Sequence, residues 1–249
     1  MPIRARSRLL TSSRTVLVAA ALLPALALTA ACGGGSSASD PSRKENKDSS
    51  PTAKFSRALL ANSDVPDVTV VPAADKAQLL GAEVTAEPRA CQPIADQWSE
   101  KAKHARQVYS GGMVTDTATK VKASKTISLE VIASYAPGEA KAVLDELTAA
   151  LAACHNYTVT RNKVASTFSV QPAPSSGAPM GDQQVTYTVA DTSRGAAGIV
   201  LVTVVRVGDT TAAYETVRQD HQPAVLRAAI PLKQVAKLRA AAKGAAKAK

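Results

Sequence analysis

Residues 199–217 read IVLVTVVRVGDTTAAYETV, and this stretch decides the fold. The part before Gly208 is almost entirely aliphatic, which is typical of a central strand covered on both faces. Gly208 and Asp209 suit a tight type II′ turn, after which residues 210–217 predict a second strand. The stretch therefore predicts a β-hairpin in the middle of an antiparallel sheet.

Further strands are indicated on both sides of this hairpin. Apolar and polar side chains alternate over residues 126–135, as in a strand with one buried face. Residues 157–170 and the segment around Val185, Tyr187 and Val189 predict additional strands, and residues 68–71 a brief one. The Pro-, Gly- and Ser-rich residues 171–182 predict a loop between them.

Helices are predicted between the strands. Residues 139–151 carry an apolar stripe at helical spacing, and Cys154 continues it. Residues 93–106 predict a second helix that contains Trp98, the only tryptophan, which suits either the core or the wall of a cleft. Short helices are expected at residues 55–60 and 75–80. The last helix is expected near the C-terminus, where Pro223 and Pro231 each suit a helix start.

These elements predict an α+β fold: one domain over residues 54–240, with an antiparallel β-sheet flanked by helices. Of the three cysteines, Cys32 belongs to an N-terminal motif described below. The other two, Cys91 and Cys154, are an even number. In an oxidising compartment they are expected to form one disulfide, and a catalytic or metal-binding cysteine is the alternative.

The N-terminal residues predict export. Several arginines precede an apolar run over residues 16–28, which is too short to span a bilayer and is typical of a secretory signal. Residues 28–32, Leu-Thr-Ala-Ala-Cys, resemble the lipobox of bacterial lipoproteins, with Thr29 in place of the usual aliphatic residue. That resemblance implies removal of residues 1–31 and attachment of lipid to Cys32, at the outer face of the cell membrane. An ordinary signal peptide with a chance cysteine is the alternative.

The net positive charge of the chain comes from its two ends. The formal charge is +10, but the leader contributes four arginines and residues 227–249 contribute seven basic residues without an acid. Residues 32–226 are nearly neutral, so nucleic-acid binding is not expected. Residues 32–53 predict a flexible tether. The basic tail, residues 241–249, is expected to be disordered, and either contacts anionic lipid or wall polymer or only aids solubility.

The pattern over residues 55–240 resembles the extracellular sensor domain of mycobacterial PknH-type Ser/Thr kinases and the actinobacterial lipoproteins that carry this domain alone. The resemblance rests on motifs spread along the chain: Leu59-Leu60, Pro88, Cys91, Ser134-Tyr135 leading into residues 139–151, Cys154, residues 204–209 and residues 234–238. It implies an antiparallel sheet flanked by helices, with a cleft for an external ligand. This chain has one pair of cysteines where the kinase domain has two disulfides, and it lacks a tryptophan shortly before Cys154.

Signatures of the common hydrolases, of metal sites and of phosphate-binding loops are absent from the sequence, so we assign no catalytic residue, metal or cofactor. If a cleft exists, amphipathic side chains are suited to line it. The candidates are Tyr109, Tyr135, Tyr187, Arg206 and Tyr214. Packing in the core or at its edge is the alternative for each tyrosine.

Three functions stay open on the sequence. The first is a lipid-anchored binding or sensor module for a small ligand or a wall fragment. The second is a structural or interaction lipoprotein that docks another envelope protein. The third is an enzyme with an unfamiliar site. A binding module predicts a deep, partly apolar pocket, whereas a docking protein predicts a flat apolar patch.

Overall fold

The computed structural model describes residues 55–161, 163–174 and 179–246. The leader, Cys32 and the tether lie outside these residues, as does the end of the basic tail. The expectations for them therefore stay predictions.

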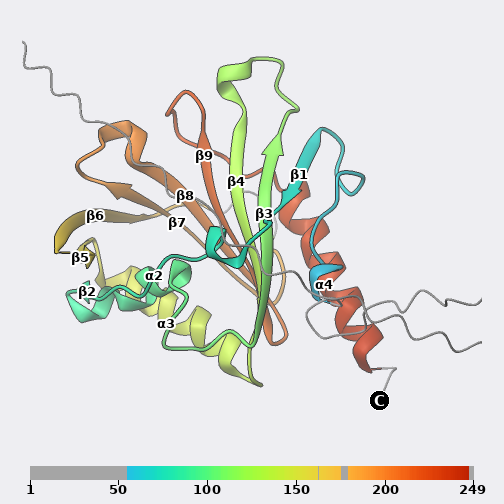
Figure 1. Cartoon of the computed structure of the whole chain (residues 1–249), viewed down its shortest axis with the longest axis horizontal. Coiled ribbons are helices and arrows are strands. Elements are labelled where there is room, and N and C mark those ends of the chain that lie inside the picture. Colours follow the sequence, from blue (N-terminus) through green and yellow to red (C-terminus); the bar gives the residue numbers. More distant parts are fainter. Residues whose placement is uncertain (1–54, 162, 175–178, 247–249) are drawn as a thin grey trace, which may run out of the picture. The chain divides into compact units, whose positions relative to one another are not determined.

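Within the described residues nine strands form a single sheet in the order β1-β3-β4-β9-β8-β7-β6-β5-β2 (Figure 1). Each neighbouring pair is antiparallel. The strands are β1 (Val68–Pro72), β2 (Ala86–Glu87), β3 (Val108–Asp116), β4 (Thr126–Ser134), β5 (Asn156–Arg161), β6 (Val164–Pro172), β7 (Gln183–Asp191), β8 (Ile199–Val207) and β9 (Thr210–Arg218). The α+β fold predicted from the sequence is confirmed.

The hairpin of residues 199–217 forms β8 and β9 in the interior of the sheet, as predicted. Gly208 has φ 57°, a backbone conformation that glycine adopts without steric cost. The hairpin lies between β7 and β4, and its middle residues are buried on both faces, Val204 and Ala213 on one and Val205 and Ala212 on the other, whereas Ile199 and Val217 at its ends are exposed.

One face of the sheet, here called the α3 face, is covered by α2 (Gln92–Ala95) and α3 (Glu139–Ala153). The apolar stripe of α3 packs on inward-facing strand residues such as Val204 and Ala213. Cys91 is bonded to Cys154, and both are buried. The predicted disulfide therefore joins the start of α2 to the end of α3.

The opposite face, here called the α4 face, is covered by α4 (Ala229–Ala246). Its core consists of apolar residues from α4, the central strands and the segment before β1. Gln234 of α4 donates a 2.7 Å hydrogen bond to the carbonyl of Ala58, which ties that segment to the helix. α4 contacts β8 and β9, and Figure 1 shows it well apart from α3.

The helix predicted over residues 93–106 is shorter than expected. α2 is followed by a 3₁₀ turn, η3 (Asp96–Trp98), and the chain is extended at Ser99. The Arg106 guanidinium donates to the carbonyls of Asp96, Gln97 and Ser99 at 2.7–3.0 Å. These carbonyls lie at the helix end, where they accept hydrogen bonds from a side chain and not from the N–H groups of a further helical turn.

Other boundaries also differ from the predictions. Residues 75–80 contain only a 3₁₀ turn, η1 (Lys76–Gln78), in which the Asp75 carboxylate accepts a hydrogen bond from the Ala77 N–H. Residues 157–170 form the two strands of the β5–β6 hairpin. α4 begins after Pro223, with Pro231 in its first turn, and continues to Ala246. Its last residues were expected in the disordered tail, but alanine and lysine are strong helix formers.

Candidate functional site

A cavity of about 200 Å³ lies on the α3 face, and we call it the Glu215 cavity. Strands β5–β9 form its floor, and the α2–η3 segment with residues 82–84 forms its wall. Its lining is mostly apolar and comprises Ala82, Val84, Ile94, Ala95, Trp98, Tyr157, Val159, Arg161, Phe168, Tyr187, Val189, Gly198, Val200, Val202 and Glu215. The α2–η3 segment contributes Ile94, Ala95 and Trp98 to this wall.

Strand register places the polar groups of this cavity. Glu215 on β9 is opposite Val202 on β8, and Val202 is opposite Tyr187 on β7. Neighbouring strands lie about 4.8 Å apart, and opposed side chains share a face of the sheet. Tyr187 and Glu215 therefore stand on the same floor, on either side of Val202.

Glu215 is a half-buried carboxyl group without a partner. No hydrogen bond or ion pair joins its side chain to any residue in the described part of the chain. Burial raises the pKa of Glu215 to about 7. Its position among apolar side chains disfavours the charged form, and no cation of the described residues forms an ion pair with it.

Two further polar groups of the lining are unsatisfied. The Tyr187 hydroxyl and the Trp98 indole N–H are buried and have no hydrogen-bond partner among the described residues. Burial, together with Tyr157 and Glu215, raises the pKa of Tyr187 well above its usual value. Buried polar groups in native proteins are normally paired, so two orphaned donors beside a cavity call for an explanation.

Aromatic side chains form much of the cavity's surface. The chain has one Trp, five Tyr and two Phe, and half of these line this cavity. Tyr157 and Phe168 stack with ring centroids 5.2 Å apart. Arg161 is exposed, packs against Gly81 and lies where the cavity meets solvent.

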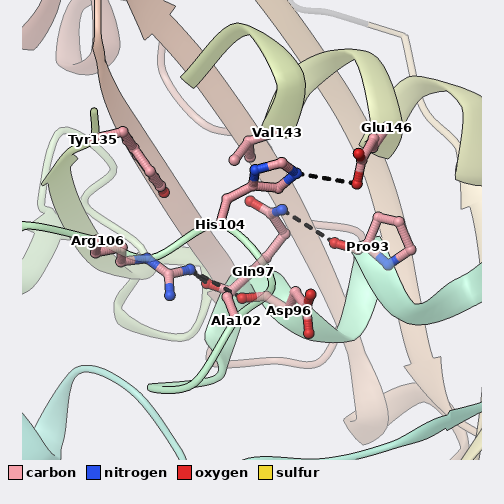
Figure 2. A pocket seen from close by; sticks show the side chains of 9 residues that line it. All are labelled: Pro93, Asp96, Gln97, Ala102, His104, Arg106, Tyr135, Val143 and Glu146. Carbon is pink, nitrogen blue, oxygen red and sulfur yellow. Dashed lines mark hydrogen bonds and ion pairs between the residues drawn. The ribbon is translucent and has the colours of Figure 1, made fainter. Parts of the chain in front are cut away.

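A second pocket lies between α3 and the segment after η3, and Figure 2 shows the side chains that line it. Its volume is about 20 Å³, enough for roughly one water molecule. His104 occupies its centre. Its Nδ1 forms a hydrogen bond with Glu139, and its Nε2 forms an ion pair with Glu146 at 3.1 Å. Lys103 also contacts Glu146, at 2.5 Å. These contacts attach residues 99–107 to α3, so this pocket is a packing feature.

Opposing effects act on His104. Burial lowers its pKa, but the hydrogen bonds and negative charges of Glu139 and Glu146 outweigh burial, so the net pKa is raised. The imidazolium form is the one that holds both carboxylates.

Three further hollows, of about 300 to 340 Å³, are lined mainly by exposed residues. None of them brings together buried polar groups without partners. The Glu215 cavity is therefore the candidate site.

The five residues suggested by the sequence occupy different places. Tyr187 lines the Glu215 cavity, and Tyr135 lines the small pocket of Figure 2. Tyr109 lies under Lys76, whose Nζ is 4.9 Å from the ring centroid. Tyr214 is on the α4 face and donates to Glu130 at 2.8 Å. Arg206 is bonded to Gln183, at 2.6 Å, and to the Gly208 carbonyl, at 3.0 Å.

Four residues of the cavity lining were not predicted from the sequence as site residues: Glu215, Tyr157, Phe168 and Arg161. A signal was present for Glu215: it follows Thr211 and Ala213 at two-residue spacing, so the alternation of β9 places a carboxyl group on a buried face. The aromatic pair had no such signal, because its residues meet only when β5 and β6 pair.

Neither a metal centre nor a membrane span is found in the part of the chain that the structure describes. No three His, Cys, Asp or Glu side chains there are grouped as metal ligands. No helix there is both long and apolar enough to cross a bilayer.

Comparison with known proteins gives similarities of structure only. No family model and no curated protein matches the chain. The extracellular domain of PknH from Mycobacterium tuberculosis is 11% identical, with a TM-score of 0.49 over 77% of this chain and 96% of that one. An uncharacterized protein of Mycobacterium smegmatis, the Rv0999 ortholog, is 14% identical, with a TM-score of 0.31 over 71% of this chain and 90% of that one. We carry no activity over from either protein.

Proposed function

We propose that this protein is an extracytoplasmic binding or sensor module that takes a small ligand into the Glu215 cavity. The observation that carries the proposal is the polar set of this cavity: the buried Tyr187 hydroxyl and Trp98 N–H, which have no hydrogen-bond partner among the described residues, and the half-buried Glu215 carboxyl beside them. An apolar cavity with a few convergent polar groups is the usual form of a small-molecule site. A volume of about 200 Å³ suits a compact ligand.

The proposal includes a lipid anchor at Cys32, which would hold the domain at the outer face of the membrane. It is supported by the basic and apolar leader and by the lipobox-like residues 28–32. The Cys91–Cys154 disulfide adds support, because such bonds persist mainly in oxidising compartments outside the cytoplasm.

A second candidate function is docking of an envelope protein. The observation in its favour is an apolar patch on β1 and β3, where Val71 is opposite Met113 and the two are 59% and 42% exposed. Exposed apolar patches can mark protein contacts. We prefer the binding module, because a patch of this kind leaves the orphaned groups of the cavity unexplained.

Mass spectrometry of protein purified from its own membrane tests the binding function. Wild type is expected to carry a reproducible small molecule. Val200→Phe, which places a larger side chain in the cavity, should reduce its recovery several-fold, whereas Val71→Phe on exposed β1 should not. The proposal fails if wild type carries nothing, or if Val200→Phe carries as much as wild type.

A further inference from the structure

The charge at the cavity floor selects among ligand classes. Glu215 is the one acidic group that lines the cavity within the described residues, and it has no partner there. A carboxylate away from water is unfavourable unless a positive group or hydrogen-bond donors approach it. A ligand that brings a positive charge would supply what the protein lacks at this position.

The lining around Glu215 also suits a cation. Trp98, Tyr157, Phe168 and Tyr187 present aromatic rings to the same space. The faces of aromatic rings carry negative potential and attract ammonium groups, most strongly where water is excluded. Aromatic walls around a carboxylate favour an organic cation over a strongly hydrated metal ion, which would need several oxygen ligands.

The positive side chain of the lining does not reverse this preference. Arg161 is exposed and lies at the rim, so solvent screens its charge. Glu215 is half-buried on β9, in the interior of the sheet between β4 and β8. An anionic ligand that reached the floor would meet the carboxylate, whereas a cation would pair with it.

We infer that the Glu215 cavity binds small organic cations, namely a protonated amine on a compact apolar body, with Glu215 as its counter-ion. This inference rests on the proposed binding function. The amine nitrogen pairs with the carboxylate, and the apolar body lies among the aromatic rings.

Three probes of nearly equal size test the charge preference: phenethylammonium, 2-phenylethanol and phenylacetate. Trp98 is the only tryptophan and lines the cavity, so its fluorescence reports binding in the purified protein. At pH 8 we expect phenethylammonium to bind at least about tenfold more tightly than either other probe. Glu215→Gln should abolish this preference.

Glu130→Gln is the matched control. Glu130 is also a buried glutamate of the same sheet, but it lies on the α4 face. This variant should keep the preference for the cation, and circular dichroism should show that both variants are folded.

Equal binding of the alcohol and the ammonium probe would overturn the cation inference and leave the binding function standing. Tighter binding of phenylacetate would overturn the inference as well. If no probe changes the fluorescence of Trp98, the inference also fails; the binding function fails with it only if protein from its own membrane carries no molecule.

Discussion

At the scale of single residues, two glutamates on neighbouring strands, one fully buried and one half-buried, have different surroundings. Glu130 on β4 is fully buried on the α4 face and accepts a hydrogen bond from Tyr214, whereas Glu215 on β9 faces the cavity without a partner. Burial raises the pKa of each to about 7. The difference in hydrogen bonding makes Glu130 part of the core and leaves Glu215 free to pair with a ligand.

The free energy of unfolding should depend on Glu130. Its pKa rises from 4.5 in the unfolded chain to about 7 on folding. Between these two pH values the folded protein therefore binds more protons at Glu130 than the unfolded chain does. Stability therefore falls as pH rises through this window, by up to roughly 3 kcal/mol for this group. We expect urea unfolding at pH 5 and pH 8 to differ less in Glu130→Gln than in wild type. An unchanged difference would contradict this assignment.

Cation binding at Glu215 should weaken in acid. The carboxylate form of Glu215 attracts the amine and the protonated form does not, and a pKa of about 7 means that Glu215 is largely protonated at pH 5. Tyr157 and Tyr187, whose pKa values are raised, stay neutral in this range, and the guanidinium of Arg161 lies at the rim. The dissociation constant of phenethylammonium should rise on the order of 30- to 100-fold from pH 8 to pH 5. A flat profile by Trp98 fluorescence would exclude Glu215 as the counter-ion.

At the scale of elements, the segment after η3 depends on the ion pairs of His104. The ion pairs of His104 stabilise the folded chain while the imidazole is protonated. Because folding raises the pKa of His104, this stabilisation is complete below pH 6.5, its ordinary pKa, and is lost as pH rises through the higher pKa of the folded protein. We expect His104→Gln to increase hydrogen exchange of residues 99–107 at pH 6 and to cost about 1–3 kcal/mol. His155→Gln, which changes an exposed histidine, is the control. Equal exchange in both variants would contradict the role given to His104.

The disulfide holds α2 and α3 together beside the cavity. It closes a loop with a sequence separation of 63, for which the chain-entropy model gives about 4 kcal/mol. Replacing both cysteines, Cys91→Ser with Cys154→Ser, should lower the free energy of unfolding by about 2–5 kcal/mol. Reductant should destabilise wild type to a similar degree in urea unfolding and leave the double variant unchanged. A double variant as stable as wild type would show that packing alone holds α2.

Elements with a strong periodic pattern could be predicted from the sequence, and elements fixed by distant partners could not. β4, β8, β9 and α3 follow from alternation or an apolar stripe. The end of α2 could not be predicted, because Arg106 and its carbonyl acceptors meet only in the fold. For the same reason four of the five suggested side chains lie elsewhere, since a cavity depends on how strands and helices pack.

At the scale of the whole molecule, the described domain has a cavity on one face of its sheet and a closed core on the other. Each face carries a buried core, the α4 face with α4 and the segment around Leu59 and the α3 face with α2 and α3, but the Glu215 cavity lies on the α3 face. This asymmetry separates stability from binding. Substitutions on the α4 face should act on unfolding alone, whereas substitutions at the half-buried Glu215 should act on ligand binding.

The lipid anchor is tested on the full chain. We expect Cys32→Ala to release the protein into the soluble fraction or to leave the leader uncleaved, because the acceptor of the lipid is lost. Cell fractionation with mass analysis of the N-terminus distinguishes these outcomes. Retention of a processed Cys32→Ala protein in the membrane would refute the anchor.

A crystal structure of the protein purified from its own membrane tests the binding site most directly. We expect density for a small molecule between Trp98, Tyr187 and Glu215, with a positive group near the Glu215 carboxylate. A cavity that holds only ordered water, bonded to the Tyr187 hydroxyl and the Glu215 carboxyl, would contradict the proposed function.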